Sequence, residues 1–143
     1  VIEDTLVLAG HQLELQKINL IKNLQPELPP VMGCPIALQQ VFTNIIFNAR
    51  DAMLEGGTLT ISNRTKDGSI EITFTDTGGG ISEEDINQIF EPFFTTKPKG
   101  KSTGLGLSVV YRIIQQHGGT IDVESKKGSG TTFRITLPVL KEE

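Results

Sequence analysis

The sequence has little cysteine and no long apolar run. Cys34 is the only cysteine among 143 residues, so no disulfide bond can form within the chain, which suits a reducing compartment. The apolar runs are far too short to span a membrane, and the chain begins at Val1, without methionine and without the features of a signal peptide. We therefore expect a cytoplasmic domain that makes no membrane contact itself and belongs to a longer protein, free or membrane-anchored.

The sequence also lacks clusters of one charge. The formal net charge is −4, and the lysines and arginines are scattered rather than arranged in a stripe with aromatic residues. Nucleic acid is therefore not an expected partner. A charged fraction of 21% beside 37% hydrophobic residues is typical of a folded domain. We expect residues 1–143 to form one domain that is monomeric in isolation.

Glycine and proline separate segments of helical and strand periodicity. Apolar residues at helical spacing predict helices over residues 4–16, 36–53 and 105–117, and a capped start predicts a short helix near residues 82–89. The helix over residues 36–53 has its apolar stripe at Leu38, Val41, Phe42, Ile45, Ile46, Ala49, Ala52 and Met53. Strands are predicted over residues 18–24, 59–61, 70–74, 121–124 and 131–137.

The order of these elements predicts the fold class. Helices and strands alternate at first, and the later strands form hairpins, one around the turn at Asp67-Gly68 and one around residues 127–130. This order indicates the α+β class, as a two-layer α/β sandwich with helices on one face of a mixed sheet.

One predicted helix carries a second, polar line of side chains. Asn44, Asn48 and Asp51 stand at i, i+4 and i+7, so they share a face. Asparagine is a mediocre helix former, and two such residues one turn apart invite a reason. A neutral amide oxygen can ligate magnesium, which keeps several waters and takes other ligands from phosphate. Two solvated polar residues would give the same pattern.

An acidic residue directly before glycines is the second feature. Asp76 follows the strand that ends at Phe74 and precedes Gly78, Gly80 and Ile81. Glycines in this position let a planar ligand approach the backbone closely. A carboxylate accepts a hydrogen bond from an exocyclic amine, so it can select adenine over guanine. A glycine-rich turn without a ligand is the alternative.

A third feature stands at the start of the predicted helix over residues 105–117. It consists of Ser102-Thr103-Gly104-Leu105-Gly106-Leu107. The free N–H groups and the dipole of a helix N-terminus favour phosphate, and the glycines let the chain come near it. The surroundings fit neither a dinucleotide-binding fingerprint nor a P-loop. A flexible helix start is the alternative.

Two adjacent aromatic residues, Phe93 and Phe94, lie between these glycine-rich segments. They can anchor an otherwise mobile lid in a loop rich in Gly, Lys and Ser. Lys97, Lys99 and Lys101 are long enough to reach phosphates from such a lid. Solvated lysines beside a hydrophobic anchor are the alternative.

Taken together and in this order, the motifs resemble the histidine kinase family within the gyrase, Hsp90 and MutL ATPase superfamily. Residues 40–49 resemble the N box, residues 76–80 the G1 box, residues 90–97 the F box, and residues 102–107 the G2 box. The run from Gly128 to Thr131, with Phe133, resembles the last glycine box. The resemblance covers residues 31–138 and is specific because it needs all of these motifs in one order.

The resemblance implies a Bergerat ATP-binding fold with ATP and Mg²⁺ as cofactors. It implies that Asn48 ligates magnesium, that Asp76 reads adenine with help from Thr131, and that residues 77–103 form a lid over the nucleotide. Asn44 and Asn48 are the implied catalytic residues. The implied nucleotide contacts are Asn44, Asn48, Asp76, Gly78, Gly80, Ile81, Phe93, Thr96, Lys97, Ser102, Thr103, Gly104, Leu105, Gly106, Leu107 and Thr131.

The chain departs from the family pattern at three positions. Ser102 replaces the glycine that usually opens the G2 box, which favours a stiffer hinge. Cys34 replaces an aspartate that would cap the following helix well. Asp51 stands where related kinases often have Lys or Arg, so a phosphate contact cannot be assigned to it.

Asn44 separates a kinase from a hydrolase in this superfamily. The ATPase branches have Glu four residues before the magnesium-binding Asn, as a general base for water. An amide cannot accept that proton, so the sequence favours phosphoryl transfer over hydrolysis.

The sequence has only two histidines, His11 and His117, and neither is followed by Glu or Asp. We therefore expect the phosphoaccepting histidine on a separate dimerisation domain of the same protein, with a response regulator as the next acceptor. A stand-alone regulator, such as an anti-sigma-factor serine kinase, is one alternative. A clamp ATPase of the MutL or Hsp90 type is the other, and Asn44 disfavours it.

Overall fold

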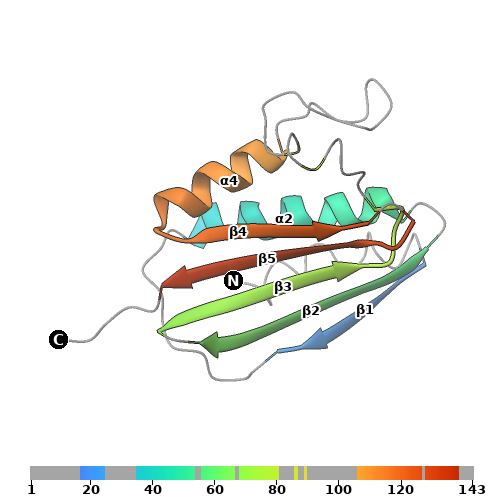
Figure 1. Ribbon diagram of the computed structural model, residues 1–143, viewed down its shortest axis with the longest axis horizontal. Coiled ribbons are helices and arrows are strands. Elements are labelled where there is room, and N and C mark those ends of the chain that lie inside the picture. Colours follow the sequence, from blue (N-terminus) through green and yellow to red (C-terminus); the bar gives the residue numbers. More distant parts are fainter. Residues whose placement is uncertain are drawn as a thin grey trace.

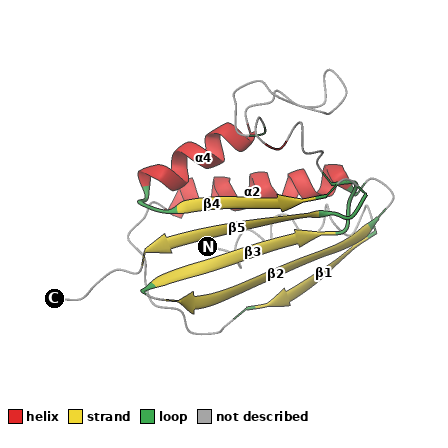
Figure 2. Ribbon diagram, in the orientation of Figure 1, coloured by secondary structure: helices red, strands yellow, loops and turns green. Residues whose placement is uncertain are grey.

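The protein folds as a mixed β-sheet with helices packed on one face (Figure 1 and Figure 2). In this computed structural model the described residues are 17–24, 35–53, 56–66, 68–80, 86, 89, 106–126 and 128–138. The predicted helix over residues 4–16 and most of the one near residues 82–89 lie outside them. Neither helix of the described part is long and apolar enough to cross a membrane.

Five strands form one sheet in the order β1-β2-β3-β5-β4. They are β1 (Ile18–Asn23), β2 (Gly57–Lys66), β3 (Ser69–Asp76), β4 (Thr120–Ser125) and β5 (Thr131–Pro138). β1 runs parallel to β2, and every other neighbouring pair is antiparallel. Both predicted hairpins, the mixed sheet and the α+β class are therefore confirmed.

Two helices, α2 (Pro35–Ala52) and α4 (Gly106–Gln116), cover the same face and pack against each other. The apolar stripe of α2 faces the sheet as predicted, and its buried members are Leu38, Val41, Phe42, Ile45, Ile46, Ala49 and Met53. The ring of Phe42 packs on Phe74 of β3 with centroids 5.9 Å apart. Ala52 was expected in this stripe but is exposed, because it ends the helix beside the turn after Asp76.

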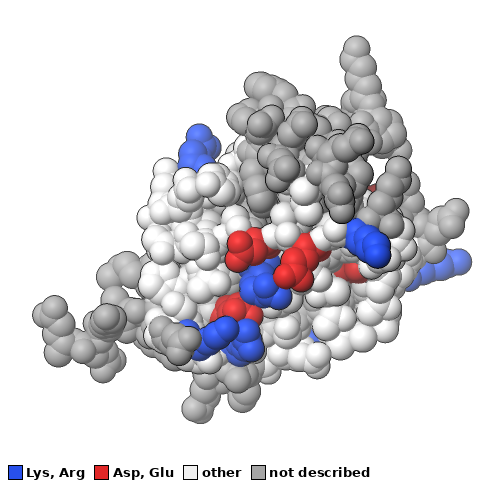
Figure 3. Space-filling view, viewed as in Figure 1, with Lys and Arg blue, Asp and Glu red and all other residues white. Residues whose placement is uncertain are grey.

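The opposite face of the sheet is polar and carries a row of ion pairs (Figure 3). Arg64 on β2 contacts Glu71 on β3 at 3.0 Å, and Arg134 on β5 contacts Glu71 at 3.5 Å and Glu124 on β4 at 3.7 Å. Each pair is partly or largely exposed and adds little stability by itself. The row keeps this face solvated, so the core lies entirely between the sheet and the helices.

Truncation of Ile135 tests where the core lies. Its side chain on β5 is 0% exposed, so Ile135→Ala should lower the free energy of unfolding by about 2–5 kcal/mol. Ile36→Ala is the matched control, since Ile36 is 79% exposed and its loss should cost less than about 0.5 kcal/mol. Urea unfolding measures both values, and equal losses would contradict this assignment of the core.

Candidate nucleotide-binding site

The ends of several elements meet at one edge of the sheet (Figure 1). β3 ends there at Asp76, which is paired with Thr131 at the start of β5. α2 ends there at Ala52, and β2 begins there at Gly57. α4 begins toward the same edge at Gly106 and runs away from it. Residues that are far apart in the sequence are thus gathered around the carboxyl end of β3.

Asp76 is the buried acidic group of this edge, with only 5% of its surface exposed. Its Oδ1 accepts the N–H of Gly78 at 2.8 Å, and the carboxylate also accepts the backbone N–H of Thr131. Burial raises the pKa of Asp76 above its usual range, and these two hydrogen bonds oppose the rise. The backbone therefore fixes the orientation of a carboxylate that is costly to keep charged.

The glycine-rich turn after Asp76 is tied to the end of α2. The N–H of Gly79 donates to the carbonyl of Ala52 at 3.4 Å. A Cβ on Gly78 would stand 2.6 Å from that same carbonyl oxygen, so only glycine fits there. Gly79 itself faces open space. The turn therefore packs against the helix on one side and leaves its backbone accessible on the other.

The loop between β4 and β5 is hydrogen-bonded to this turn without covering the open side of Gly79. The N–H of Gly128 donates to the carbonyl of Gly79 at 2.7 Å. Gly130 has a φ of +93°, and a Cβ there would collide with the carbonyl oxygen of Asp76. The last glycine box thus contacts the first one directly.

Thr131 is paired with Asp76 across β3 and β5 and is itself only 5% exposed. The Thr131 hydroxyl lies 2.8 Å from Oγ of Ser125, which in turn donates to the carbonyl of Gly130 at 3.0 Å. Because the Ser125 proton is used on that carbonyl, the Thr131 hydroxyl donates to Ser125. Ser125, which the sequence did not single out, therefore fixes the direction in which the Thr131 hydroxyl can accept a hydrogen bond.

The polar line on α2 lies next to the turn. Asn48 stands one helical turn before Ala52, whose carbonyl holds the turn, and Asn44 stands one turn further back. Both asparagines are half-buried. The two side chains therefore share one face of the helix, with Asn48 one turn nearer than Asn44 to the helix end.

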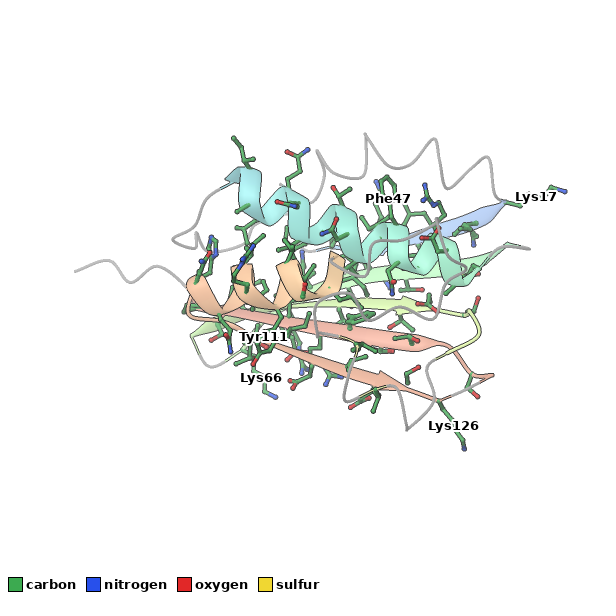
Figure 4. All side chains as sticks on the ribbon, turned by 90° about the horizontal axis from the view of Figure 1, so that it is seen from above. Lys17, Phe47, Lys66, Tyr111 and Lys126 are labelled. Carbon is green, nitrogen blue, oxygen red and sulfur yellow. The ribbon has the colours of Figure 1, made fainter. Side chains whose placement is uncertain are left out.

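Asp51 belongs to the same line but has a structural partner. Its Oδ1 lies 3.3 Å from the guanidinium of Arg50, which is stacked 4.4 Å above the ring of Phe47. Phe47 points away from α4 (Figure 4). The ion pair thus accounts for the acidic residue at a position where related kinases often carry a base.

Eight of the sixteen predicted nucleotide-contact residues lie within the described part of the chain, and the assignment of all sixteen stays a prediction. The described ones are Asn44, Asn48, Asp76, Gly78, Gly80, Gly106, Leu107 and Thr131. Of these, Asp76, Gly78, Gly80 and Thr131 lie at the carboxyl end of β3. Outside the described residues lie Ile81, Phe93, Thr96, Lys97, Ser102, Thr103, Gly104 and Leu105.

Three contributors were missed by sequence reasoning. They are Thr77, Ser125 and the Ala52 carbonyl. Ser125 could have been found from strand register, since it is paired with Thr131. No sequence signal marks a backbone carbonyl.

Comparison with known proteins agrees with this geometry. Residues 33–141 match the family of histidine kinase-, DNA gyrase B- and HSP90-like ATPases. The chain is 41% identical over 140 residues to Sporulation kinase E of Bacillus subtilis (strain 168), covering 97% of this chain and 19% of that protein.

Solved structures share the fold. The nucleotide-free catalytic domain of histidine kinase ThkA has a TM-score of 0.85 and 31% identity, with 96% of this chain and 90% of that chain covered. Full-length ShkA in complex with AMPPNP has a TM-score of 0.86 and 25% identity, and the match covers 99% of this chain and 30% of that chain.

The chain therefore belongs to the family of histidine kinase-, DNA gyrase B- and HSP90-like ATPases, in its histidine kinase branch, and has the Bergerat fold that the motifs implied. It spans only 14% to 30% of the length of the curated relatives that it matches.

Asp76→Asn should change the pH dependence of stability. The folded-state pKa of Asp76 is raised above its reference value of 3.8, so folding favours the protonated acid. The resulting stability is present below the unfolded pKa and is lost as pH rises through the folded pKa. The unfolding free energy of the wild type minus that of the variant should therefore fall as pH rises above about 4. Urea unfolding of both proteins up to neutral pH measures this difference, and a rise with pH would contradict the assignment.

Proposed function

We propose that this domain binds Mg·ATP and donates the γ-phosphoryl group to a histidine on a separate dimerisation domain of the same protein. A response regulator is the next acceptor. The observation that carries the proposal is the buried Asp76 carboxylate, oriented by backbone N–H groups beside an accessible glycine turn. The relatives and solved structures that are named as histidine kinases support this branch over a stand-alone regulator. The domain would act in the cytoplasm, as a monomer when isolated.

Adenine would be read at Asp76. A carboxylate accepts a hydrogen bond from the exocyclic amine of adenine and repels the carbonyl that guanine has there. Thr131 adds a hydroxyl acceptor next to it, held by Ser125. Because Gly79 faces open space, a planar base can approach the turn without meeting a side chain.

The phosphates fit the start of α4 and the polar line of α2. The first turn of α4 contains no acidic residue, so no side-chain charge there opposes the helix dipole, which favours an anion at this end. The amide oxygen of Asn48 suits magnesium, which neutralises phosphate charge when bound. Within the described ranges no group of three His, Cys, Asp or Glu side chains could hold a metal ion. Magnesium would therefore need phosphate oxygens and waters in addition to Asn48.

Residues 77–103 would close over the nucleotide as a lid. Closure excludes water from the phosphates and completes the site. Catalysis then consists of positioning and charge neutralisation, which is what phosphoryl transfer requires. Asn44 can orient a group near the γ-phosphate but cannot take a proton from water.

The magnesium assignment predicts a specific loss in Asn48→Ala. The variant should bind ATP with nearly the same affinity with and without magnesium, because the amide ligand is gone. Asn19→Ala, an exposed asparagine on β1, is the matched control and should keep the wild-type response. Calorimetric titration with ATP in magnesium and in EDTA measures both. A full magnesium response in Asn48→Ala would show that the ion is held elsewhere.

Phosphoryl transfer itself is tested with the acceptor domain supplied in trans. The domain alone should release phosphate from ATP very slowly, and it should label the dimerisation domain on histidine, giving an acid-labile product. An acid-stable phosphoserine would support the anti-sigma-factor type instead.

Asn44→Glu should raise phosphate release, because a positioned base commonly contributes about 10²–10⁴-fold. Asn44→Gln introduces a side chain as long as that of Glu but without a base, so phosphate release by this variant should stay slow. Brisk hydrolysis by the unmodified domain would favour a clamp ATPase.

A further inference from the structure

Thr77, the residue directly after Asp76, is bound to two other elements. Its N–H donates to the carbonyl of Thr58 at 3.2 Å, and its Oγ1 accepts the N–H of Thr58 at 3.0 Å. The same hydroxyl donates to Sδ of Met53, just past the end of α2, at 3.6 Å. The side chain of Thr77 thus joins β2, the end of α2 and the glycine turn.

The hydroxyl of Thr77 stands in for a backbone carbonyl. In a regular hydrogen-bonded antiparallel pair the N–H of Thr58 would go to the carbonyl of Thr77. Here it goes to the side chain, so the chain can leave the sheet at Thr77 while the N–H of Thr58, near the start of β2, keeps a partner. The sharp departure places the N–H of Gly78 within 2.8 Å of the Asp76 carboxylate.

The space for this arrangement is made by Gly57. A Cβ at Gly57 would stand 2.6 Å from Sδ of Met53 and 2.7 Å from Oγ1 of Thr77. Any larger residue at Gly57 would therefore push both partners of the sulfur–hydroxyl contact apart. Met53 is itself 2% exposed, so its sulfur is a fixed point of the core.

Thr77 is also the only residue of the turn that can make a side-chain contact. Residues 78–80 are all glycine, and their contacts to Ala52 and Gly128 run through the backbone. Backbone hydrogen bonds hold the turn to Ala52 and Gly128. The threonine hydroxyl fixes its position along β2.

We propose that Thr77 is a positioning residue for adenine recognition: it sets the orientation of the Asp76 carboxylate by pinning the turn to Thr58 and Met53. This inference rests on the proposed function, in which Asp76 reads adenine. Thr77 acts through Asp76, so its effect should be confined to the base and should leave phosphate binding unchanged.

Thr77→Val tests the role of the hydroxyl, since valine keeps the shape and removes the hydrogen bonds. ATP should bind about three- to tenfold more weakly, the size of one lost hydrogen bond. Thr77→Ser should restore wild-type affinity. Thr75→Val is the matched control, because Thr75 loses a comparable hydroxyl contact, to Thr132 at 3.2 Å, two residues before the turn, and ATP affinity should not change.

Two further readouts separate positioning from general stability. The ratio of the GTP to the ATP dissociation constant should fall in Thr77→Val, since adenine selectivity is lost while phosphate contacts remain. In a double-mutant cycle, Thr77→Val should weaken ATP binding little or not at all when Asp76→Asn is already present. Calorimetry measures every affinity, and thermal unfolding identifies any variant that fails to fold.

Met53→Leu provides a second variant if Thr77→Val does not fold. It conserves volume, removes the sulfur acceptor and should shift ATP affinity in the same direction. Wild-type ATP affinity in Thr77→Val, an equal loss for ATP and GTP, or additivity with Asp76→Asn would each overturn the inference. Unchanged ATP affinity in Asp76→Asn alone would overturn the proposed adenine site, and with it this role of Thr77.

Discussion

The packing of α2 on the sheet is the contact on which the rest of the structure depends. The contact of Phe42 with Phe74 and the burial of Met53 fix the rotation of α2 about its axis. They also fix its position along that axis relative to the sheet. That rotation keeps Asn44 and Asn48 together on one half-buried face of the helix, because side chains one turn apart share a face. The position of α2 along its axis brings the carbonyl of Ala52, at the end of the helix, to the glycine turn. A core contact therefore sets the geometry of a polar site that contributes nothing to the core.

The site edge shows a conflict between stability and binding. Asp76 is buried beyond what a charged group tolerates cheaply, and its pKa rises accordingly. Two backbone N–H groups compensate in part. In the proposed complex the exocyclic amine of adenine would donate one more hydrogen bond to this carboxylate, which would offset part of the cost of keeping it charged.

Periodicity was sufficient for the two helices and five strands of the described residues, but it could not show contacts across the sheet. The stripe on α2 and both hairpins follow from local patterns. The pairing of β3 with β5 does not follow from local patterns, because about 55 residues separate Asp76 from its partner Thr131. Thr77 looked like an ordinary turn residue, since its partners Thr58 and Met53 become neighbours only through that register. Ala52 was misplaced because helix periodicity does not show where the sheet below it ends.

The far end of the sheet has a different character from the site. All of the described site elements converge at the Asp76 end of β3, whereas the other end is the turn at Gly68, about 25 Å away along the strand. Gly68 is exposed, and a Cβ there would meet nothing within 4 Å. Surface turns of this kind accept inserted segments readily. A fluorescent reporter or a fused module could be grafted at Gly68, so that the domain would carry new cargo at one end while the nucleotide edge at the other keeps its native surroundings.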